Sequence, residues 1–90
     1  MTKPTEEELQ QALAEAGRMR EMGEDPHHIA KALLNCHYQS GYLLAVLHSA
    51  EDYLRSGMSE REHTRLVRAV EKAREVDDRS AKVERPSLGL

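Results

Sequence analysis

The chain has 90 residues and a formal net charge of −3, and its hydrophobic content of 39% includes no Trp, no Phe and only three Tyr. A chain of this length forms at most one domain and buries a modest fraction of its surface, so association with another chain is a natural source of further burial. The charge excludes a generally basic nucleic-acid-binding protein, but it allows a local basic surface. The single Cys excludes an intramolecular disulfide and a Cys-based zinc site, which fits a reducing compartment.

Two features predict a soluble cytoplasmic protein. The N-terminal residues lack the apolar segment of a secretory signal. The longest fully apolar run, Tyr42–Leu47, is far shorter than the ~20 residues that a membrane-spanning helix needs. We therefore expect no membrane segment.

Residues 5–22 are predicted to form the first helix. Thr5 and Glu8 have the spacing of a capping box, in which each side chain binds the backbone N–H of the other residue. Gly23 follows as the left-handed residue that ends many helices. Because only Gly23 to Asp25 connect this helix to the next, it should return nearly antiparallel to it.

A long central helix is predicted over residues 26–56. Asp25 supplies an N-cap, Pro26 is tolerated in the first turn, and Gly57 follows the end. Residues at alternating spacings of four and three form an unbroken packing stripe: Ile29, Leu33, Cys36, Ser40, Leu43, Leu47, Ala50 and Leu54. At ~1.5 Å per residue the helix is about 45 Å long.

A third helix is predicted over residues 60–79, because Ser59 and Glu62 repeat the capping-box spacing. Leu66, Val70 and Ala73 should face inward. Residues 80–90 show no periodicity and are expected to be a disordered tail. The predicted fold is all-α: a single domain of residues 1–79, with a long central helix and two shorter antiparallel helices, which completes a bundle by dimerisation.

The predicted dimer interface lies on one side of the central helix, where all three tyrosines of the chain gather. Ser40 and Gly41 leave little side-chain bulk there, so a second backbone could approach closely. The predicted interface residues are Tyr38, Tyr42, Val46, Tyr53, Ser40 and Gly41. Two alternatives stay open: the tyrosines pack within the chain, or the seam lies on the Leu34, His37, Leu44 and His48 side.

A basic ridge on the third helix is the second candidate surface. Its four cations, Arg61, Arg65, Arg68 and Lys72, are spaced four, three and four residues apart. Acids lie beside them, so solvated salt bridges are one interpretation. Contact with nucleic acid or with an acidic protein is the other, although no aromatic residues are interleaved among the cations.

Candidate catalytic and metal-binding residues are few. The five histidines and Cys36 show no recognisable zinc spacing, so we predict no metal site, with a site shared across a dimer interface by His37 or His48 as the alternative. Cys36 is expected to be a small core residue rather than a nucleophile. The absence of a nucleotide loop or a nucleophile motif from the sequence predicts no cofactor and no enzymatic activity.

The sequence therefore predicts a small helical protein–protein interaction module, a homodimeric regulator or adaptor. The alternative is a nucleic-acid-associated regulatory protein that uses the basic ridge.

Overall fold

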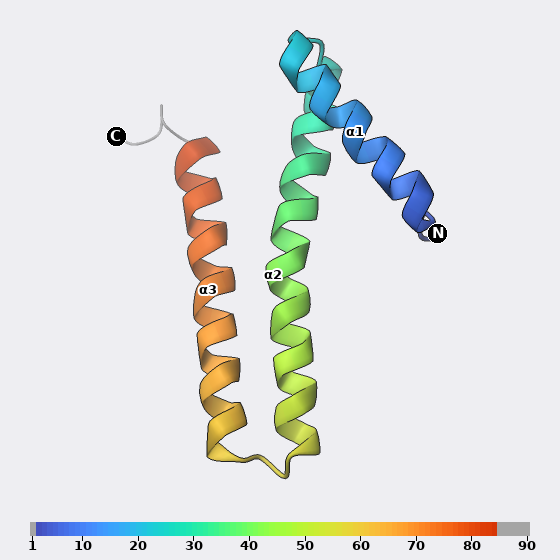
Figure 1. Cartoon of the computed structure of the whole chain (residues 1–90). Coiled ribbons are helices and arrows are strands. Elements are labelled where there is room, and N and C mark those ends of the chain that lie inside the picture. Colours follow the sequence, from blue (N-terminus) through green and yellow to red (C-terminus); the bar gives the residue numbers. More distant parts are fainter. Residues whose placement is uncertain (1, 85–90) are drawn as a thin grey trace. The chain divides into compact units, whose positions relative to one another are not determined.

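The structure, a computed structural model, describes the backbone of residues 2–84 and the side chains of residues 2–79. Within this range all elements are helical: α1 (Glu6–Met22), a 3₁₀ turn η1 (Pro26–His28), α2 (Ile29–Arg55) and α3 (Glu60–Glu84) (Figure 1). The all-α prediction is confirmed. The chain divides within α2 into two compact units, of which the first ends at His37 and the second begins at Tyr38.

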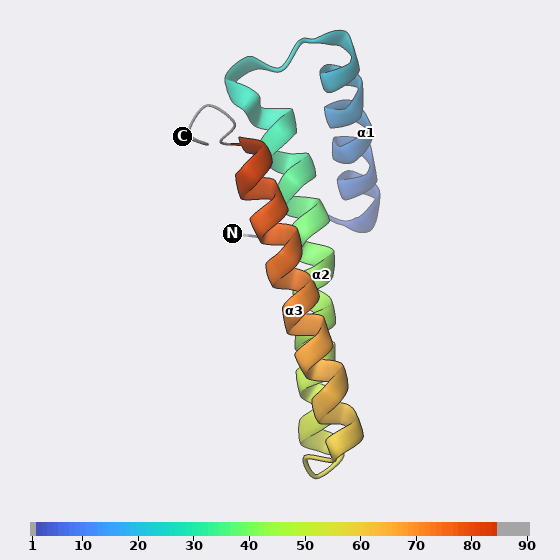
Figure 2. The same cartoon turned by 90° about the vertical axis from the view of Figure 1, so that its left-hand side faces the viewer.

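The first unit contains α1, η1 and the start of α2. The capping box predicted for α1 is present: the Thr5 hydroxyl oxygen accepts from the Glu8 N–H at 3.0 Å, and a Glu8 carboxylate oxygen accepts from the Thr5 N–H at 2.8 Å. Gly23 ends the helix with a φ of 70°, a conformation that glycine adopts without steric cost. The chain then reverses direction into α2, as Figure 2 shows.

The predicted start of the central helix is wrong by three residues. Pro26–His28 form the 3₁₀ turn η1, in which His27 and His28 have φ values of 57° and 60°, and α2 begins at Ile29. Asp25 still caps α2, but across this turn. Its carboxylate accepts from the backbone N–H groups of Ala30 at 2.7 Å and Lys31 at 3.0 Å, which satisfies two orphan donors at the helix start.

Asp25 is also paired with Arg20, at 3.1 Å between Nη1 and Oδ2, and its side chain is only 6% exposed. Burial by itself would raise the pKa of this carboxyl group. The two backbone N–H donors and the Arg20 guanidinium outweigh burial, and they leave the pKa of Asp25 below its ordinary value. Asp25 therefore stays ionised at neutral pH and holds both ends of the connection.

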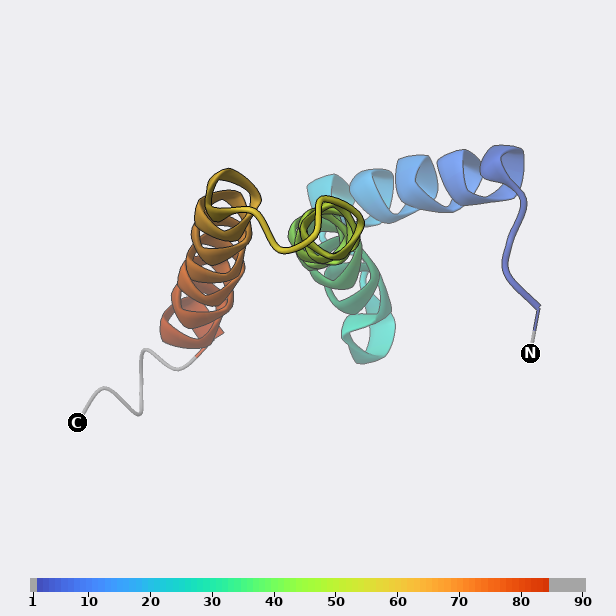
Figure 3. The same cartoon turned by 90° about the horizontal axis from the view of Figure 1, so that it is seen from below.

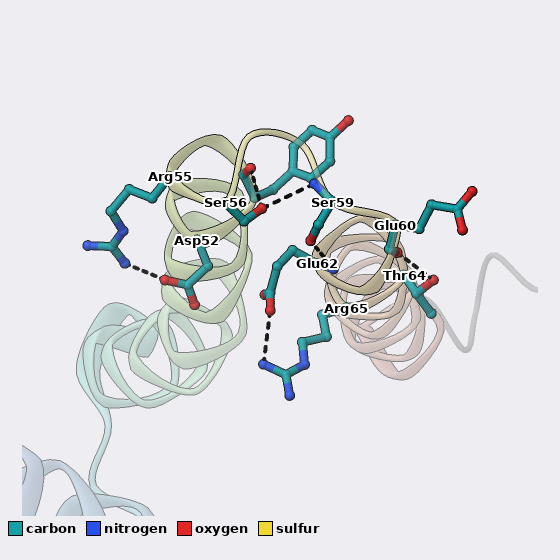
Figure 4. A network of polar contacts seen from close by, with 9 residues as sticks. Asp52, Arg55, Ser56, Ser59, Glu60, Glu62, Thr64 and Arg65 are labelled. Carbon is teal, nitrogen blue, oxygen red and sulfur yellow. Dashed lines mark hydrogen bonds and ion pairs between the residues drawn. The ribbon is translucent and has the colours of Figure 1, made fainter.

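The second unit is a helical hairpin in which α2, from Tyr38 onward, runs antiparallel to α3 (Figures 1 and 3). Gly57 and Met58 in the connection both have positive φ, and the Met58 N–H donates to the Tyr53 carbonyl at 2.9 Å. The Ser59 hydroxyl then caps α3 by accepting from the Glu62 N–H at 3.3 Å (Figure 4). Ion pairs between Asp52 and Arg55 and between Glu62 and Arg65 flank this end, the closed end of the hairpin.

The third helix is longer than predicted. It continues to Glu84 instead of ending at residue 79, and an ion pair joins Arg79 to Glu75 one turn earlier. The predicted disordered tail is thus helical in its backbone over residues 80–84, and its remainder, residues 85–90, lies outside the described residues.

Each helix of the hairpin turns one seam of less exposed residues toward the other. On α3 these are Glu62, Leu66, Ala69, Ala73 and Val76, and on α2 they are Gln39, Tyr42, Val46, Ser49 and Tyr53. Both sets recur at spacings of three and four, as in left-handed helix pairs. Val70, which was predicted to face inward, is 38% exposed instead.

The core of the described chain is small. The buried hydrophobic residues are Ala16 and Ala30 in the first unit and Val76 in the second. None of the Leu, Ile, Met or Tyr side chains in the described part is buried. Much of the apolar side-chain surface that the sequence provides is therefore left in contact with solvent.

Candidate interaction surface

Three of the four leucines of the predicted packing stripe lie exposed on α2, and the fourth, Leu33, is half-buried. Leu43 is 61% exposed, Leu47 51% and Leu54 67%. Successive residues of a helix point about 100° apart. Leu43 therefore points about 100° away from Tyr42, which lies in the seam with α3. Because α3 packs on the tyrosine side, the leucine stripe is left without a partner in this part of the chain.

Val70 of α3 extends this apolar surface across the hairpin. A groove of about 430 Å³ lies between the two helices and has Leu43 and Val46 on one wall and Val70 and Ala73 on the other. Its remaining lining residues are polar or charged: Gln39, Arg74, Asp77 and Asp78. We refer to the surface formed by Leu43, Leu47, Leu54 and Val70 as the leucine face.

Three of the predicted interface residues lie in the seam within the chain. Tyr42, Val46 and Tyr53 are half-buried. The Nζ atom of Lys72 lies 6.0 Å from the centroid of the Tyr42 ring, and the His63 ring centroid lies 5.7 Å from that of Tyr53. Within the second unit, α3 therefore runs alongside the side of α2 that carries these three residues.

The other predicted interface residues are differently placed. Tyr38 is 54% exposed, and its hydroxyl group lies 3.3 Å from that of Tyr42. This hydrogen bond raises the pKa of the Tyr42 hydroxyl above its ordinary value. Ser40 is half-buried and Gly41 is exposed. A Cβ atom built on Gly41 would meet no atom within 4 Å, so no other backbone approaches this glycine within the described chain.

The basic ridge is partly neutralised by its own helix. Arg65 pairs with Glu62 at 3.4 Å, and Lys72 lies 3.8 Å from Glu75. Arg61 and Arg68 are exposed and form no ion pair with any residue in the described range. Exposed ion pairs of this kind contribute at most about 1 kcal/mol. The ridge therefore has two guanidinium groups available to an external anion.

Cys36 and the five histidines are the residues considered as candidate metal ligands or nucleophiles. Cys36 is exposed rather than buried in a core, contrary to the prediction, and it continues the stripe of Leu43 and Leu47. Among the described side chains, no three histidine, cysteine or acidic residues are grouped as metal ligands would be.

No helix in the described range has the length and apolar character needed to span a membrane.

Comparison with known proteins gives no further guide. No protein-family model, no curated protein and no solved structure matches the chain. The leucine face is thus identified from its geometry alone. The sequence contained a signal for it, since the stripe of spacings three and four already included Leu43, Leu47 and Leu54.

Proposed function

We propose that the chain is a small helical protein–protein interaction module, a regulator or adaptor, which binds its partner through the leucine face. The observation that carries this proposal is the contrast between exposure and burial. Four large apolar side chains gather on one face of the hairpin, at 38–67% exposure, while the described chain buries only two alanines and one valine. Exposed apolar side chains that gather on one face mark interaction sites in soluble proteins.

The free energy available at the face is considerable for a chain of this size. Full burial of a Leu or Val side chain contributes ~1.5–3 kcal/mol, and these four are about half covered already. Covering the rest therefore contributes roughly 1 kcal/mol for each residue, before the cost of association. A folded domain of 90 residues is stable by about 5–13 kcal/mol, so a partner on this face would raise the stability by a substantial fraction.

Photo-crosslinking in the cells that produce the protein tests this proposal. The photoreactive amino acid p-benzoylphenylalanine replaces Leu47 in one variant and Ala45, which is exposed on another side of α2, in the control. We expect the Leu47 variant to form a discrete covalent adduct and the Ala45 variant to form none. If neither position gives an adduct, or if both give the same one, the leucine face is not the binding surface.

The basic ridge supports a second candidate function, a nucleic-acid-associated regulatory role. The observation in its favour is that Arg61 and Arg68 project from α3 without an ion pair among the described residues. Two such groups, beside neutralised neighbours and without an aromatic stacking platform, offer a phosphate backbone little. We therefore place this function second.

A further inference from the structure

We infer that the partner of the leucine face is a second copy of this chain, which packs antiparallel so that two α2–α3 hairpins form a four-helix bundle. This inference rests on the proposed function of the leucine face and names its occupant. Three observations support a second copy and this orientation: the composition of the seam, the shape of the face, and the distribution of charge along it.

The seam between α2 and α3 is too poor in large apolar side chains to hold a hairpin by itself. Five of its ten residues are polar or small, namely Gln39, Ser49, Glu62, Ala69 and Ala73, and of the five larger apolar or aromatic ones only Val76 is buried. Isolated helices gain most of their stability from packing an apolar face, so this hairpin needs cover on its second face in order to fold. A cover needed for folding must always be present, and a second copy of the chain meets this condition.

The shape of the face is suited to a copy of itself. The leucines of α2 form a ridge, and the groove between Leu43 and Val70 lies directly beside it. Under two-fold symmetry each copy presents both features, so the ridge of one hairpin can enter the groove of the other in two equivalent contacts. Ridge-into-groove packing is the usual geometry of helix pairs in bundles.

Charge along the face favours the antiparallel orientation. Asp77 and Asp78 line the groove at the open end of the hairpin, with Arg74 as the one lining cation. In a parallel dimer the two acidic ends would meet. In an antiparallel dimer the Asp77 and Asp78 pairs of the two copies lie at opposite ends of the bundle, and each faces a closed end that also contains three arginines, Arg55, Arg61 and Arg65. Like charges close together would weaken the parallel form.

Molar mass and spin-label distances test this arrangement together. Light scattering of the purified wild type should give twice the 10.2 kDa chain mass. A Cys36→Ser background is then labelled at Thr64→Cys in one sample and at Arg79→Cys in another, both on exposed positions of α3. These sites are 15 residues apart, about 22 Å along the helix. In each sample the measured distance joins the two labels at the same residue of the two copies. In an antiparallel dimer the separations along the axis at residue 64 and at residue 79 cannot both be less than about 22 Å, whereas in a parallel dimer both are short.

A pair of double variants locates the dimer interface. Leu43→Asp with Leu47→Asp should raise the dissociation constant of the dimer by about 100-fold or more, because two carboxylates would be desolvated at each copy of the face. Tyr38→Asp with Ala45→Asp, two exposed positions on another side of α2, should leave it unchanged. Loss of the dimer only in the variant with Tyr38 and Ala45 replaced would show that the dimer interface does not lie on the leucine face.

The outcomes separate this inference from the proposed function. A wild type that remains at the chain mass, together with a crosslinked adduct of another protein at Leu47, overturns the second copy but leaves the leucine face as a binding surface. A monomer without any adduct overturns both. A dimer in which both same-site distances are short overturns the antiparallel arrangement.

Discussion

Gly41 lies in the middle of α2, and its replacement by alanine distinguishes the leucine face from the tyrosine side as the site of association. In the described chain a Cβ atom at this position meets nothing within 4 Å. Alanine therefore introduces no clash there, and it loses less conformational entropy than glycine when the helix forms. On the helix, Gly41 projects well away from Leu43 and Leu47, so a partner on the leucine face does not approach it.

We expect Gly41→Ala to stabilise the protein. The gain is about 1 kcal/mol for each chain, which corresponds to a rise of roughly 4–8 °C in the thermal midpoint of a domain of this size. Circular dichroism melting curves, recorded at the same protein concentration for both proteins, measure it. Gly17→Ala in α1 is the matched control, because a Cβ there also meets no atom within 4 Å.

The contrary result has a definite meaning. If a second backbone crosses α2 close to Ser40 and Gly41, the added methyl group blocks that approach. Gly41→Ala would then lower the midpoint and weaken dimerisation, while Gly17→Ala would still stabilise. Such a result would refute the placement of the dimer interface on the leucine face.

Three further predictions concern the connection, the tyrosines and the basic ridge. Asp25→Asn should lower the thermal midpoint at neutral pH. Because the folded-state pKa of Asp25 is lowered, the stability advantage of the wild type over this variant should shrink as the pH falls through that pKa. A difference in midpoint that does not depend on pH would show that the carboxylate charge contributes nothing. Tyr38→Phe should lower the titration midpoint of Tyr42, followed by its ring NMR signals, because the hydrogen bond that raises it is lost; an unchanged midpoint would mean that the two hydroxyl groups do not interact in solution. Arg65→Glu with Arg68→Glu should abolish any salt-sensitive retention on immobilised nucleic acid, and retention that depends on neither salt nor these arginines would eliminate the nucleic-acid role.

Local sequence signals predicted most of the helix ends. Thr5 and Glu8 form the capping box that their spacing predicted, and Gly23 and Gly57 adopt the left-handed conformation expected after a helix. These features depend on a few neighbouring residues, so the sequence contains what determines them. The start of α2 was missed because it depends on two left-handed histidines, a conformation that non-glycine residues seldom adopt.

The side of α2 that packs on α3 could not be decided from the sequence. Two stripes with spacings of three and four run side by side along this helix, one through Tyr42 and Val46 and the other through Leu43 and Leu47. Periodicity identifies both, but the choice between them depends on contacts with a distant helix. The more apolar stripe was expected to pack within the domain, whereas α3 covers the other one.

The solvent accessibility of the leucine face in the purified protein distinguishes a face covered by a second copy from a free one. A soluble paramagnetic agent broadens the methyl NMR signals of exposed side chains. If a second copy covers the face, the methyl groups of Leu43, Leu47 and Leu54 are protected at high micromolar concentration and become accessible on dilution, while Met22, which is 62% exposed in α1, is broadened throughout. Leucine methyl groups that are broadened as strongly as that of Met22 at every concentration would show that no second copy covers the face.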